Sequence, residues 1–218
     1  MHILGAVYMI KNIMRYFSLL HLTSNKGYKG IIESKKINKS VHNIEKGKIQ
    51  WLGDGIYFWD INDLYARKLG INLIKGRSPF VKITGIKIDF EINSSNIIDL
   101  DNDTWAQEYI DFLKKISPDK YEKILDYKKI IQEQSKVGSL ESNKLGELTG
   151  STLNLFVDYL KETKGKNIDL IIGYFHHNTN KNSRYIFARE KKDIAQYCIK
   201  NDELVNSCMD NWKFIHNI

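Results

Sequence analysis

A stretch rich in apolar residues first appears at 15–24, in "RYFSLLHLTS". This pattern predicts a β-strand that ends near Thr23 and Ser24. The apolar positions at 25–34 fit a short helix. The stretch at 35–50 is polar and has no period, so it predicts a loop.

The stretch "WLGDGIYFWD" at 51–60 has four bulky residues in a row after two glycines. An apolar run of this length, bounded by turn residues, is typical of a buried strand. Because side chains alternate along a strand, Tyr57 and Trp59 face one side of it and Ile56 and Phe58 face the other. We expect one face to pack in the core and the other to offer flat rings to a ligand.

A helix is predicted directly after this strand. It has apolar positions at Leu64, Leu69 and Leu73. Either Asp60 or Asn62 can cap its first turn, since short polar side chains bind the unpaired N–H groups there.

The sequence from about 101 to 165 has a helical texture, with Pro118 and the region from Gly146 to Gly150 as interruptions. Strands are predicted on both sides of it, at 79–90, 96–100, 168–175, 183–190 and 193–201. Strands, a helical middle and then strands again favour an α+β fold over alternating βαβ units.

The length and composition suit one folded unit, because 218 residues that are 42% hydrophobic can bury a sizeable core. We expect a single domain over 1–218 with a helical insertion at about 101–165. The net charge is +7, and 28 of the 33 basic residues are lysines. This bias fits an ordinary solvated surface as well as a phosphate-rich partner, and both interpretations stay open.

The two cysteines, Cys198 and Cys208, have neither a disulfide framework nor a metal-ligand spacing, which fits a reducing compartment. The N-terminal apolar run from Ile3 to Ile10 is too short to span a bilayer and has no basic leader. We expect a cytoplasmic protein with no membrane partner and no metal site.

Three short motifs occur in order along the chain: "LHLTS" with His21, "GDGIYFWD" with Tyr57, and "AQYCIKND" with Gln196. Together they resemble the ADP-ribosyltransferases of the diphtheria-toxin and poly(ADP-ribose) polymerase branch, whose signature is a His, a Tyr and a Glu on three strands. A bacterial toxin-like subgroup carries a similar "GxGxYFW" strand and has Gln in the place of Glu. The resemblance extends from about residue 15 to 205.

The resemblance implies a split, mostly antiparallel sheet around a nicotinamide pocket, with NAD as the substrate. In that pocket His21 would hydrogen-bond the ribose hydroxyls or the amide, and the ring of Tyr57 would stack on nicotinamide. Gln196 would hold the ribose while the bond to nicotinamide breaks. Glu190, six residues earlier, is the candidate base for the acceptor.

The resemblance also implies further NAD-binding positions: Leu22, Thr23, Gly55, Tyr65 and Ala66. The backbone of the two residues after His21 would bind the carboxamide, and Ala66 would be the small residue early in the following helix. The chain departs from the family in having Leu22 where Gly is usual. It also has Lys68 and Leu69 where a second stacking aromatic is expected, so that Tyr65 would substitute.

The activity that the resemblance implies is mono-ADP-ribosylation of a macromolecule, which can be RNA, DNA or protein. A toxin or a phage-defence effector is the expected setting, with an antitoxin or immunity protein as a further partner. Three alternatives stay open. One is an NAD glycohydrolase, and another is an inactive module that binds ADP-ribose or nucleic acid, in which Gln196 and Leu22 mark lost chemistry. The third is a nucleic-acid enzyme of another kind, which the absence of carboxylates at metal-site spacing disfavours.

Overall fold

The computed structural model describes residues 13–43, 45–46, 48–77, 79–134, 140–175, 194–216 and 218. The predicted strand at 183–190 and the candidate base Glu190 therefore lie outside the described residues. None of the helices in these ranges is both long and apolar enough to cross a membrane.

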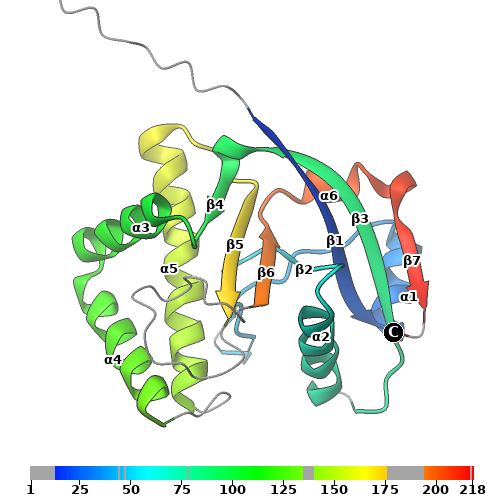
Figure 1. Ribbon diagram of the computed structural model, residues 1–218, viewed down its shortest axis with the longest axis horizontal. Helices are drawn as coiled ribbons and strands as arrows, with labels where there is room; N and C mark the ends of the chain where they lie inside the picture. Colours follow the sequence, from blue (N-terminus) through cyan, green and yellow to red (C-terminus); the bar gives the residue numbers. More distant parts are fainter. Residues whose placement is uncertain are drawn as a thin grey trace, which may run out of the picture.

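The described residues form seven strands, six α-helices and two short 3-10 helices. In chain order these are β1 (Met14–Ser24), α1 (Asn25–Ser34), β2 (Ile56–Asp60), α2 (Leu64–Arg77), β3 (Ile83–Asn93), η1 (Ser94–Asn96), β4 (Ile97–Asp99), α3 (Asp103–Ile116), α4 (Pro118–Gln134), α5 (Leu140–Lys164), β5 (Leu170–Phe175), β6 (Ile194–Ile199), α6 (Asp202–Asn206), η2 (Met209–Asn211) and β7 (Lys213–His216). The strands make one sheet in the order β4-β5-β6-β2-β1-β3-β7 (Figure 1). Every neighbouring pair is antiparallel except β4 and β5, so the predicted α+β class with a mostly antiparallel sheet is confirmed.

The pairing between β1 and β2 is short. These strands share two paired positions in the described chain, Leu19 with Asp60 and Leu20 with Trp59. β1 pairs along its whole length with β3, whereas β2 pairs with β6. Figure 1 shows β1 and β3 curving away from β5 and β6. A gap in the hydrogen-bond ladder therefore opens beside the residues that precede Trp59 on β2.

One face of the sheet carries a core in which Ile56 and Phe58 of β2 pack with Leu19 of β1 and Ile88 of β3. The alternation read from the sequence puts these two β2 residues on one side, and the structure agrees. Val205 of α6, which is not part of the sheet, packs in the same core.

The opposite face is covered by helices in two places. Trp59, Leu20 and Leu22 pack with Ala66 of α2. Further along the sheet, the helical middle of the chain covers β4 and β5. There a cluster joins Phe156 of α5 to sheet residues such as Ile171.

Trp59 corrects the expectation that one face of β2 offers its rings to a ligand. Its side chain is 6% exposed and lies in the core. α2 comes so close that a Cβ at Gly70 would stand 2.5 Å from the indole Nε1. At Trp59 this face of β2 is packed, because a helix follows the strand directly and covers the tryptophan.

The sequence pattern predicted that the region from Gly146 to Gly150 interrupts the helical stretch, and this prediction is wrong. α5 runs through both glycines. A Cβ at Gly146 would stand 2.7 Å from the Trp51 ring, and one at Gly150 would overlap the carbonyl oxygen of Gln50. The glycines let the loop before β2 lie directly on the helix, which offsets their cost of roughly 1 kcal/mol each in helix propensity.

Two further details differ from the sequence prediction. The side chain of Asp63, rather than Asp60 or Asn62, accepts hydrogen bonds from the N–H groups of Tyr65 and Ala66 at the start of α2. After β6 the chain adds α6 and β7, which the sequence pattern did not predict because both are very short.

Candidate functional site

The three strands that carry His21, Tyr57 and Gln196 are neighbours in the sheet, in the order β1, β2 and β6. β2 and β6 pair so that Tyr57 lies opposite Cys198, and Trp59 lies opposite Gln196. Tyr57 and Gln196 are therefore diagonal neighbours on one face, a relation in which Cα atoms stand about 7 to 8 Å apart.

His21 follows Leu20, the last residue of β1 that pairs with β2. Its Nδ1 is 2.9 Å from the carbonyl oxygen of Tyr57, and its ring meets Phe58 edge to face with centroids 5.6 Å apart. Because a carbonyl oxygen only accepts, Nδ1 carries the proton and donates it. In the neutral ring Nε2 is then an acceptor, and in the described chain it makes no hydrogen bond.

The surroundings of His21 favour this neutral form. Burial lowers the pKa of the imidazole, because a charged ring is poorly solvated there, and the hydrogen bond to the Tyr57 carbonyl offsets part of the shift. At neutral pH the ring therefore presents an acceptor nitrogen on a fixed support.

The hydroxyl of Tyr57 is engaged by the loop that precedes β2. It donates to the carbonyl oxygen of Gly53 at 2.6 Å and accepts from the N–H of Leu52 at 3.1 Å. Burial raises the pKa of this phenol well above its ordinary value, so it stays protonated. Its ring is half-buried against the cluster formed with the helical middle.

Both glycines of "GDG" occupy positions where a side chain would not fit. Gly53 has a φ of 76°, in the left-handed region that favours glycine. A Cβ on it would overlap the side chain of Asn154 on α5. At Gly55 a Cβ would stand 2.5 Å from the sulfur of Cys198 and 2.6 Å from the carbonyl oxygen of Ile199. The loop therefore packs closely against both α5 and β6.

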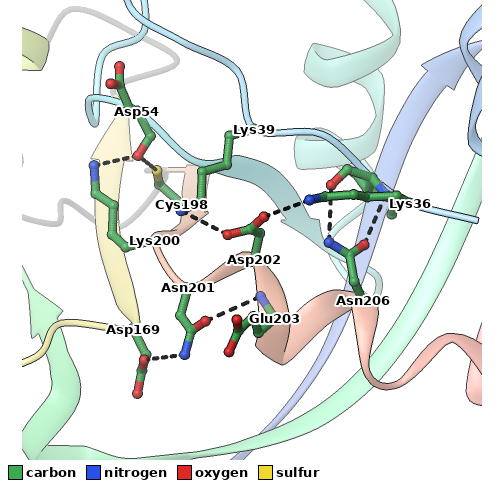
Figure 2. Close-up of polar contacts among 11 residues, drawn as sticks. Lys36, Lys39, Asp54, Asp169, Cys198, Lys200, Asn201, Asp202, Glu203 and Asn206 are labelled. Carbon is green, nitrogen blue, oxygen red and sulfur yellow. Dashed lines mark hydrogen bonds and ion pairs between the residues drawn. The ribbon is translucent and has the colours of Figure 1, made fainter. Parts of the chain in front are cut away.

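Lys200, just after β6, holds the same loop from outside. Its ammonium donates to the carbonyl oxygens of Leu52 and Asp54 at 2.8 and 2.7 Å, and to the Asn154 side chain at 3.2 Å. Figure 2 shows Lys200, Cys198 and Asp54 together at this end of β6. Burial lowers the pKa of this lysine, the expected cost of removing an ammonium from water.

Sequence analysis did not identify Lys200 or Asn154. Lys200 lies within "AQYCIKND", but the resemblance gives it no role, and a lysine after a strand is usually a solvated residue. Asn154 belongs to none of the motifs. Their contacts join positions 46 to 148 residues apart, which no local pattern reveals.

Gln196 is half-buried on β6, between Trp59 of β2 and Gly173 of β5. Within the described residues its side-chain amide makes no hydrogen bond that would engage it elsewhere. It can therefore offer both a donor and an acceptor to a ligand.

The other predicted NAD-binding residues fall into two groups. Leu22 is buried under α2, and Thr23 follows it at the end of β1. On α2, Ala66 is fully buried in the same core, whereas the side chain of Tyr65 is 66% exposed. The Tyr65 ring lies at the surface next to the buried alanine.

The structure brings the three main candidates to one part of the sheet but not to one face. The ring of His21 shares its face with Phe58, whereas Tyr57 and Gln196 point to the other face. The link between them is the hydrogen bond from His21 to the Tyr57 backbone, across the gap between β1 and β2.

A cavity of about 420 Å³ lies elsewhere, between α3 and the end of α5, with Phe112 and Tyr159 among its lining residues. None of the predicted site residues lines it. The described part of the chain contains no group of three or more His, Cys, Asp or Glu side chains that could hold a metal ion.

Comparisons with models of protein families, with curated proteins and with solved structures found no match for this chain.

Proposed function

We propose that the protein is an NAD-dependent mono-ADP-ribosyltransferase with a split sheet of the ADP-ribosyltransferase type. The observation that carries this proposal is the arrangement of β6, β2 and β1 as neighbours, with the ring of His21 bonded to the Tyr57 carbonyl where the pairing of β1 with β2 ends. The ordered motifs of the sequence support it, since the resemblance requires those three strands to lie together.

In the proposed reaction the bond between nicotinamide and ribose breaks, and nicotinamide leaves as a neutral molecule. The acceptor forms a bond to the same ribose carbon and loses its proton. The neutral His21, with Nδ1 protonated, offers Nε2 as an acceptor for a ribose hydroxyl. The Gln196 amide, which points to the other face, would hydrogen-bond the ribose from the opposite side of the gap between β1 and β2 as positive charge develops on it.

Tyr57 acts through its ring and through its support of the loop. Its hydroxyl is engaged by Leu52 and Gly53, so the phenol has no proton to give to the reaction. Stacking on the flat nicotinamide ring is the contribution that this geometry leaves to it. Glu190 stays the proposed base for the acceptor on sequence grounds, and a toxin or phage-defence role is proposed on the same grounds.

The test is to incubate the protein with NAD labelled separately in its nicotinamide and adenylate parts. We expect free labelled nicotinamide together with adenylate label on a macromolecule. Release without macromolecular label would instead favour the glycohydrolase. No release at all would overturn the proposed reaction and favour a binding module.

Two variants show whether any release arises at the proposed site. His21→Ala and Gln196→Ala should each slow nicotinamide release by roughly 10- to 1000-fold, because each removes a hydrogen bond that positions or stabilises the reacting ribose. The matched control is Gln107→Ala on α3, an exposed position at which we expect the native rate. Native rates in His21→Ala and Gln196→Ala would place the reaction elsewhere.

A further inference from the structure

Positive charge is concentrated in one segment of the chain, residues 25–50, which we call the basic segment. It contains seven lysines and two glutamates, a net charge of +5. The other 192 residues share the remaining +2 of the net charge of +7. All seven lysines are exposed.

A lysine-rich composition alone does not explain this concentration. The helical stretch at 101–165 is also rich in lysine, with ten of them, yet twelve acidic residues give it a net charge of −2. A uniform bias toward lysine would give both stretches a similar ratio of lysines to acidic residues. Residues 25–50 differ because they lack the neutralising carboxylates.

The basic segment borders the candidate site. It begins four residues after His21, and further on its backbone pairs with the loop before Tyr57. The N–H of Ser40 donates to the carbonyl oxygen of Gly55 at 2.8 Å, and the N–H of Gly55 donates back at 3.0 Å. A molecule held on this segment would therefore lie beside the two strands at the gap.

α6 fixes the middle of the basic segment. The carboxylate of Asp202 binds the ammonium groups of Lys36 and Lys39, at 3.3 and 2.9 Å. The side chain of Asn206 accepts from the N–H of Ile37 at 2.9 Å and donates to its carbonyl oxygen at 3.5 Å. Figure 2 shows these contacts as one network. The part of the segment from Lys36 to Lys39 is thus held against α6.

Lysines on either side of this network are available to a ligand. Lys26 and Lys29 on α1, and Lys46 and Lys48 before β2, are exposed and form no ion pair within the described residues. Four exposed lysines without an ion pair, in a segment that has few carboxylates, match a polyanion such as a phosphodiester backbone.

An aromatic cluster includes one residue of α1. Tyr28, between Lys26 and Lys29 in the sequence, meets the rings of Phe214 and His216 on β7 edge to face, with centroids 5.5 and 5.4 Å apart. Phe214 is 38% exposed. Exposed rings beside lysines are the combination that binds single-stranded nucleic acid, because unpaired bases can stack on them.

We propose that the basic segment binds single-stranded nucleic acid and that this strand is the acceptor of the ADP-ribose. The inference rests on the proposed function, whose acceptor it names. The ribose carbon that loses nicotinamide forms its new bond to a nucleophilic oxygen or nitrogen of the strand, and the proton of that group passes by way of the proposed base to solvent.

The first experiment measures binding without NAD. Fluorescence anisotropy with short labelled single-stranded RNA, single-stranded DNA and duplex DNA should show tighter binding of a single strand, with an affinity that falls steeply as salt rises. The variant K26Q/K29Q/K46Q/K48Q should bind about 10- to 100-fold more weakly, and its salt slope should be lower by up to about 3.

The control K115Q/K123Q/K129Q/K161Q removes the same charge from exposed lysines of the helical stretch and should bind as the native protein does. Phe214→Leu should weaken single-strand binding by about 5- to 100-fold with little change in the salt slope. Equal affinities for the two lysine variants, or a preference for duplex, would overturn the inference.

The second experiment follows the label from NAD in a mixture of nucleic acid and protein. Label on a single strand, lost in the four-lysine variant while nicotinamide release continues, supports the inference. Label on protein alone would overturn it and leave the proposed function intact. If no nicotinamide is released, the proposed function fails, and the acceptor role fails with it even if the strand binds.

Discussion

At the scale of single residues, His21 and Lys200 are two basic groups that differ in charge and in the number of their hydrogen-bond partners. His21 is kept neutral and bonded to one carbonyl, whereas the ammonium of Lys200 is surrounded by three oxygens. Burial lowers the pKa of both. Each therefore has a measurable effect on stability.

The lowered pKa of His21 predicts a pH dependence. Between its folded pKa and the ordinary value near 6.5, the unfolded state binds more protons than the folded one, so stability rises with pH across that window. Acidification from pH 7 should therefore destabilise the native protein relative to His21→Gln, by at most about 1.4 kcal/mol per pH unit. Urea unfolding of both proteins between pH 5 and 8 measures the difference. Relative stabilisation of the native protein by acid would contradict the prediction.

For Lys200, we expect Lys200→Met to lower the free energy of unfolding by about 1 to 3 kcal/mol, because carbonyl oxygens of the loop lose their donor. Nicotinamide release should fall as well, since the loop also holds the Tyr57 hydroxyl. Lys213→Met, at an exposed position on β7, is the matched control for denaturant unfolding. Equal stability of the two variants would show that the ammonium adds nothing to the loop.

At the scale of elements, the loop before β2 lies so close to α5 that the helix needs glycine at the contact. Gly150→Ala should destabilise the protein even though alanine is the better helix former, because its Cβ would overlap the carbonyl oxygen of Gln50. Gly76→Ala on α2, where a Cβ meets nothing within 4 Å, should be neutral or stabilising by up to about 1 kcal/mol. Thermal unfolding of the pair tests this, and a stabilised Gly150→Ala would show that the loop and helix are not in contact.

At the scale of the whole molecule, the helical middle and the sheet share one apolar cluster. Phe156 and Leu160 of α5 pack there with Ile98 of β4, Ile171 of β5 and Cys198 of β6. We expect the two parts to unfold together, because neither can expose this cluster without the other losing its cover.

Phe156→Ala tests this coupling. The substitution should cost about 3 to 5 kcal/mol, since the ring is fully buried. Amide hydrogen exchange should then accelerate in β5 and β6 as well as in α5. Faster exchange confined to the helices would show that they unfold as a separate unit.

Much of the fold could be predicted from the sequence because its elements have strong local periods. The strand at 15–24, the helix after it and the helical middle all appear near the predicted places. The candidate site was less accessible. His21, Tyr57 and Gln196 could be selected by motif, but the pattern did not show that His21 faces away from the other two.

The sequence by itself determined which residues alternate and which repeat with a helical period, since those signals depend on neighbours a few positions apart. It also fixed the uneven charge of residues 25–50. Only the tertiary structure decided that the ring of His21 bonds the carbonyl of Tyr57, 36 residues away, and that Lys200 reaches Leu52 across 148 residues. Such contacts depend on how the strands are ordered and where their pairing ends, and local side-chain patterns carry no information about either.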